Sequence, residues 1–96
     1  MEIRIQDQDS KGTTVAINDG VEIAEMTYSK AGTKQIIINH MEVNNSVQRQ
    51  GIGRQLLEVI VTYARDNHRK IIPLCPFARR EFDKDDSLHD ELKQRL

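Results

Sequence analysis

The pattern of hydrophobic and polar positions gives the first half of the chain the period of β-strands. Apolar residues alternate with polar ones over short stretches, as they do in strands with one buried face. Four such stretches, separated by turn-forming residues, lie at residues 2–6, 13–17, 21–28 and 35–43. Asp19-Gly20 separates the second from the third and favours a tight hairpin, because glycine accepts a positive φ. The fourth stretch contains Ile36, Ile37 and Ile38 in succession, which predicts a central strand covered on both faces.

From residue 51 onward the apolar period becomes that of a helix. The spacing predicts an amphipathic helix over residues 51–68, with a buried stripe of Ile52, Leu56, Leu57, Ile60, Val61 and Ala64. The short apolar run 71–75 predicts a fifth strand, near an edge of the sheet because Pro73 lacks a backbone donor. A turn or short helix is expected after Pro76. Ser87 is predicted to cap a final helix, with leucines four residues apart at Leu88, Leu92 and Leu96.

This order of elements predicts an α/β fold with a mixed sheet. The first strands are joined by short turns, so we expect them to pair antiparallel. The unit from residue 35 to residue 75 is a strand, a helix and a strand, and we expect it to form a right-handed parallel crossover. The 96 residues allow one small hydrophobic core, which predicts a single domain over residues 1–96.

Composition and charge argue against several classes of protein. Lysine and arginine total 14 and aspartate and glutamate total 15, and the formal net charge of −1 argues against nucleic-acid binding. No apolar run approaches the roughly 20 residues of a membrane-spanning helix, and the first residues do not resemble a signal peptide. The single cysteine, Cys75, favours a reducing cytoplasmic location. One cysteine and three scattered histidines match no zinc-ligand spacing, so no metal site is expected.

A glycine-containing loop between the fourth strand and the long helix is the most informative segment. It comprises Gln48-Arg49-Gln50-Gly51-Ile52-Gly53-Arg54. Its two glycines leave backbone amides accessible at the positive end of the helix, which is a suitable site for an anion such as phosphate. The alternative is a connection whose glycines serve close packing. Neither the Walker motif nor the three-glycine dinucleotide motif fits this spacing.

The loop resembles the Q/R-x-x-G-x-G/A motif of the GNAT superfamily of acyl-CoA-dependent N-acyltransferases. The chain is most similar to a short, single-domain GNAT-like group that carries a histidine on the fourth strand and Cys-Pro-Phe after the fifth. In that family the loop amides hold the pyrophosphate of coenzyme A, and the end of the fourth strand, here Met41 to Val43, lies along the pantetheine arm. The resemblance implies an N-acetyltransferase that uses acetyl-CoA and an unidentified amine acceptor.

His40 and Cys75 are the candidate catalytic residues. They lie near the carboxyl ends of the two strands that flank the helix, where open α/β sheets bind ligands. An imidazole exchanges protons near neutral pH, so we expect His40 to take the proton of the amine. Cys75 is expected either to protonate the departing thiolate of coenzyme A or to accept the acetyl group first. The structural alternatives are an inert core cysteine and a half-buried His40 that shares a face with Ile36 and Ile38.

The sequence also departs from the larger GNAT enzymes. Residues 7–12 occupy the place of the helices that commonly wall the acceptor site in those enzymes. Phe77 follows the cysteine, whereas larger members often use a tyrosine near the last helix as the general acid. The alternative function is therefore a non-catalytic module that binds coenzyme A or another protein. We expect a monomer or a weak homodimer, and Arg79-Arg80 either reaches a phosphate or is a solvated surface pair.

Overall fold

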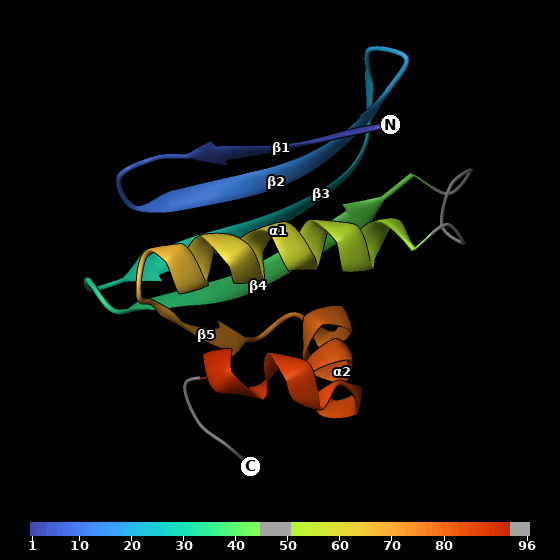
Figure 1. Ribbon diagram of the computed structural model, residues 1–96. Helices are drawn as coiled ribbons and strands as arrows, with labels where there is room; N and C mark the ends of the chain where they lie inside the picture. Colours follow the sequence, from blue (N-terminus) through green and yellow to red (C-terminus); the bar gives the residue numbers. More distant parts are fainter. Residues whose placement is uncertain (45–50, 93–96) are drawn as a thin grey trace.

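The computed structural model describes residues 1–44 and 51–92, and five strands in it form one sheet. The strands are β1 (Glu2–Asp7), β2 (Lys11–Asn18), β3 (Val21–Ala31), β4 (Gln35–Val43) and β5 (Lys70–Pro73). They stand in the order β1-β2-β3-β4-β5, and only the β4–β5 pair is parallel (Figure 1). This mixed sheet confirms the predicted fold class, and β5 is its last strand, as Pro73 indicated.

Three helical segments accompany the sheet. They are α1 (Ile52–Asp66), α2 (Pro76–Lys84) and the 3-10 helix η2 (Asp86–Glu91). The predicted stripe of α1 is buried in full, at Ile52, Leu56, Leu57, Ile60, Val61 and Ala64. Figure 1 shows α1 across one face of the sheet, with α2 and η2 beside β5. Within the described residues, no helix is both long and apolar enough to span a membrane.

The helices cover one face of the sheet, so the expectation that β4 is covered on both faces is wrong. Buried side chains from the strands, α1, α2 and η2 form one apolar cluster. Ile37, on the other face of β4, is only half-buried, and no described helix lies over it. The β1–β2 connection is a tight turn, in which the Gln8 amide donates to the Lys11 carbonyl at 2.8 Å, and it contains no helix that could cover that face.

The carboxyl end of the chain differs from the predicted final helix. The 3-10 segment η2 ends at Glu91, and it is capped by Asp85, whose side chain accepts from the Ser87 amide. Leu92 has an extended backbone and bridges Ile71 of β5, which draws the chain out of the helix. Leu96 lies outside the described residues.

A bulge in β4 decides which side chains face α1. Ile38 pairs with Tyr28, but the next pair is His40 with Thr27, so Asn39 is an additional residue in the strand. The extra residue moves every later side chain of β4 to the opposite face. Met41 and Val43 therefore pack against the core, as partners of the buried Met26 and Ala24. The expectation that His40 shares a face with Ile36 and Ile38 is corrected by this bulge.

Candidate functional site

The start of α1 has the backbone geometry expected of an anion site. Gly51 is the N-cap residue and has φ 68° and ψ 18°, a left-handed conformation that favours glycine. The first turn contains no acidic residue, and the first amides of a helix have no partner within it. Gln48, Arg49 and Gln50, which belong to the predicted loop, lie outside the described residues.

A groove of about 550 Å³ opens beside the start of α1. It runs between the end of β4, the first turn of α1 and one face of α2, and its lining residues are Met41, Val43, Gly51, Ile52, Gly53, Arg54, Phe77, Glu81 and Lys84. Every predicted cofactor-binding residue within the described part of the chain is in this set. The structure thus brings together residues that are separated by about ten positions in the sequence, and adds three from α2.

Gly53 shows why glycine is needed at the floor of this groove. A Cβ atom at Gly53 would lie 2.8 Å from the Cζ atom of Phe77 and 2.9 Å from the sulfur of Met41. Both distances are shorter than an ordinary van der Waals contact, so the Phe77 ring and the Met41 thioether would have to move if a side chain were present at residue 53. Close packing against Phe77 and Met41 is therefore one role of glycine in this loop.

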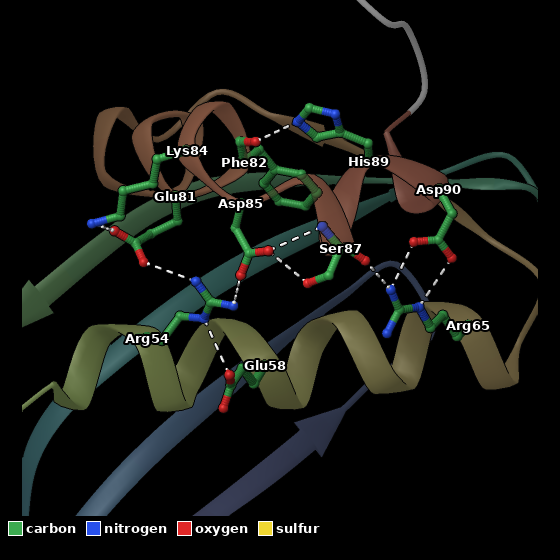
Figure 2. Close-up of polar contacts among 10 residues, drawn as sticks. All are labelled: Arg54, Glu58, Arg65, Glu81, Phe82, Lys84, Asp85, Ser87, His89 and Asp90. Carbon is green, nitrogen blue, oxygen red and sulfur yellow. Dashed lines mark hydrogen bonds and ion pairs between the residues drawn. The ribbon is translucent and has the colours of Figure 1, made fainter.

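Arg54 is held by three carboxylates, one from α1, one from α2 and one from the junction between α2 and η2 (Figure 2). Its guanidinium donates to Glu58 at 3.1 Å, to Glu81 at 3.2 Å and to Asp85. The hydrogen bond with Asp85 and those with the other two carboxylates raise the pKa of Arg54. Arg54 belongs to the predicted cofactor-binding loop, and in the structure these ion pairs also join α1 to α2.

Two of the carboxylates that bind Arg54, those of Glu81 and Asp85, have lowered pKa values and are ionised over a wider pH range than usual. Burial by itself would raise the pKa of Glu81, but hydrogen bonds from Lys84 and Arg54 outweigh it and the pKa is lowered. Asp85 has its pKa lowered to about 2, first by the hydrogen bond from the Ser87 hydroxyl and then by Arg54. The charges at this end of the groove are therefore paired, which limits the net negative potential facing an anionic ligand.

The two predicted catalytic residues lie on different sides of the sheet. His40 is on the face without helices, where its Nε2 atom is 2.9 Å from the Glu42 carboxylate and 53% of its side chain is exposed. Cys75 is only 4% exposed and belongs to the core cluster. The amides of Leu74 and Cys75 both donate to the Ile38 carbonyl, at 3.1 and 3.0 Å, where β5 ends and α2 begins. The structure does not place the histidine and the cysteine in contact.

Several residues of the site were missed by sequence reasoning. Phe77, Glu81 and Lys84 line the groove from α2, and Glu42 is the hydrogen-bond partner of His40. Phe77 precedes Glu81 by four residues, and Glu81 precedes Lys84 by three. A helical projection of α2 would therefore have placed all three on one face. Within residues 1–44 and 51–92, no group of side chains has the composition of a metal site.

Comparisons with known proteins agree with this architecture. A sequence profile of the GCN5-related N-acetyl-transferase family matches residues 13–92. No curated protein matches the chain. Among solved structures, the chain is similar to a GCN5-like N-acetyltransferase candidate from Staphylococcus aureus, with 31% identity and a TM-score of 0.71. That similarity covers 97% of this chain and 90% of the other.

Two further structures are similar in fold at lower identity. The ribosomal-protein-alanine N-acetyltransferase of Brucella melitensis has 15% identity and a TM-score of 0.67, over 80% of this chain and 62% of the other. A GNAT family acetyltransferase from Elizabethkingia anophelis, with acetyl-CoA bound, has 19% identity and a TM-score of 0.64, over 78% of this chain and 52% of the other. The chain thus spans less than two thirds of these two larger proteins.

Proposed function

The chain belongs to the GCN5-related N-acetyltransferase family, and we propose that the groove between β4, α1 and α2 is where it holds acetyl-CoA. The observation that carries the proposal is that each predicted cofactor-binding residue in the described part of the chain lines this one groove. The reaction moves the acetyl group from the thioester to an amine acceptor.

The groove has an apolar part and an anion-binding part, which correspond to the pantetheine arm and the pyrophosphate of coenzyme A. Met41, Val43 and Phe77 supply apolar surface near the end of β4, which suits the pantetheine arm. The amides at the start of α1 suit the pyrophosphate, because a helix N-terminus combines free N–H donors with a favourable dipole. The acyl group would then lie toward the sheet and the nucleotide toward α2.

Transfer requires the amine to lose protons and the thiolate to gain one. The amine nitrogen attacks the thioester carbonyl carbon, the C–S bond breaks, and coenzyme A leaves as a thiolate. His40 is the proposed base, and its hydrogen bond to Glu42 would orient the ring. Cys75 is the proposed proton donor to the thiolate, with nucleophilic attack by its sulfur as the alternative. The cysteine's burial favours the donor role, because an acetylated side chain needs additional space.

We also propose that the protein works in the cytoplasm as a single domain, monomeric or weakly dimeric, without nucleic-acid or membrane partners. The balanced charge and the single cysteine support this setting.

The proposal is tested by thermal unfolding with acetyl-CoA. A ligand that binds only the folded state at about 100 times its dissociation constant stabilises it by roughly 2.7 kcal/mol, so we expect a clear rise in melting temperature. Gly51→Glu, which places a carboxylate in the anion site, should abolish the rise. Gly51→Ala has the same backbone conformation to satisfy, with open space around its Cβ position, and should retain much of it. No shift for the wild type at millimolar acetyl-CoA would refute the proposal.

A further inference from the structure

Lys84, the last residue of α2, lines the groove and brings a positive charge to it. We propose that Lys84 recognises the 3′-phosphate of coenzyme A, so that the protein distinguishes coenzyme A from 3′-dephospho-coenzyme A. The inference rests on the proposed function, because it requires that the groove holds the cofactor. It assigns a specificity-determining contact to a residue outside the glycine loop.

Three residues of α2 show which end of the groove is apolar and which is charged. Phe77, Glu81 and Lys84 lie on one face of α2, and from the first to the last the helix rises by about 10 Å. Phe77 is at the apolar end, since its ring stands over Gly53 beside the Met41 sulfur. Lys84 is therefore at the opposite, charged end. A cofactor whose pantetheine arm lies along β4 would direct its adenosine 3′-phosphate toward Lys84.

Lys84 is also the more available of the two cations in the groove. Arg54 is bound by three carboxylates, whereas Lys84 among the described residues makes one ion pair, with Glu81 at 2.8 Å. The Lys84 side chain is 68% exposed and that of Glu81 only 10%. Figure 2 shows the Lys84 ammonium beside the Glu81 carboxylate that also binds Arg54. A phosphate carries more negative charge than a carboxylate, so it can attract the mobile ammonium while Glu81 keeps its bond to Arg54.

The arginines on α2 do not occupy this position. Arg79 and Arg80 are exposed and neither lines the groove. Arg79 is two residues from Phe77, which places it about 200° around the helix, on the side away from the groove. It provides a matched control, because Arg79→Ala removes one positive charge from the same helix.

The test compares the affinities of coenzyme A and 3′-dephospho-coenzyme A by titration calorimetry. We expect the wild type to prefer coenzyme A by roughly three- to tenfold, as for an exposed pair involving a doubly charged phosphate. Lys84→Ala should remove this preference by weakening coenzyme A alone, and Lys84→Arg should retain it. Arg79→Ala should leave the ratio of the two affinities unchanged.

Each contrary result has a separate meaning. If the wild type binds neither compound, the proposed function is wrong. If the wild type binds both and Lys84→Ala leaves their ratio unchanged, the groove holds the cofactor but the role of Lys84 is refuted. An equal loss of preference in Arg79→Ala would also overturn the inference, because the effect would then come from the overall charge of α2 and would fall with ionic strength in both variants.

Discussion

A single hydrogen atom in place of a side chain at Gly53 allows α2 to lie against α1. We predict that Gly53→Ala lowers the affinity for acetyl-CoA more than it lowers stability. The added methyl group would displace Phe77 and Met41, which are flexible ends that line the groove. The intrinsic gain of about 1 kcal/mol for alanine over glycine in a helix offsets part of the strain. Titration with acetyl-CoA and the urea midpoint measure the two effects.

A second substitution shows whether displacement of Phe77 is the cause. Phe77→Leu shortens the side chain that the methyl group would meet, so combining it with Gly53→Ala should recover part of the lost affinity. The pair is close enough for such coupling. An unchanged affinity in Gly53→Ala would show that the groove does not depend on this contact.

Individual residues differ in how far the sequence could predict them. Gly51 and Gly53 were identifiable because a local spacing at a helix start has a local consequence. The ion pairs of Arg54 with Glu81 and Asp85 could not be predicted from the sequence. These partners follow Arg54 by 27 and 31 residues, and only tertiary packing brings them together. The orientation of His40 was missed because alternation along β4 assumes an uninterrupted strand, and the bulge at Asn39 has no clear sequence signal.

Among the elements, those with a strong hydrophobic period were predicted best. The strands and α1 appear with boundaries close to those expected, because apolar residues recur in each with the period of its secondary structure. The final helix was predicted less well, because the spacing of the leucines does not show that tertiary contacts end the helical segment at Glu91. The Arg65 guanidinium donates to the Ser87 carbonyl and to Asp90, and the Lys70 ammonium donates to the Asp90 carbonyl. These contacts hold η2 against α1 and β5.

The junction of α1, α2 and η2 should make stability depend on pH in the acid range. Asp85 has a folded-state pKa of about 2, below its ordinary value near 3.8, so it contributes stability above pH 4 that is lost as the pH falls toward 2. We predict that Asp85→Asn lowers the melting temperature at pH 6 and flattens its decline between pH 4 and pH 2. Thermal unfolding at intervals across this range measures both effects.

Asp83→Asn is the control for this prediction. Asp83 is an exposed acid on the same helix, so its substitution removes an equal charge without removing a bond to Arg54 or Ser87. A decline for Asp85→Asn as steep as that of the wild type would mean that another carboxylate governs acid unfolding.

The molecule as a whole separates the groove proposed for acetyl-CoA from an open sheet face. The groove is enclosed by β4, α1 and α2, whereas the face that carries His40 and Glu42 has no described helix over it (Figure 1). Small-molecule sites normally enclose most of their ligand, which an open face does not do. We propose that the acceptor binds on this open face, beside His40, and supplies much of the cover itself.

This asymmetry predicts a preference for amines that belong to larger molecules. We expect a lysine in a peptide of about ten residues to be acetylated with a higher kcat/KM than Nα-acetyl-lysine amide, because a peptide can bury more surface on the open face. The two acceptors present the same amine, so the comparison isolates the contribution of the surrounding chain. It is measured with saturating acetyl-CoA by release of free thiol, and His40→Ala should lower both rates. A micromolar KM for the small amide would contradict the prediction, because tight binding of an amine that small requires enclosure.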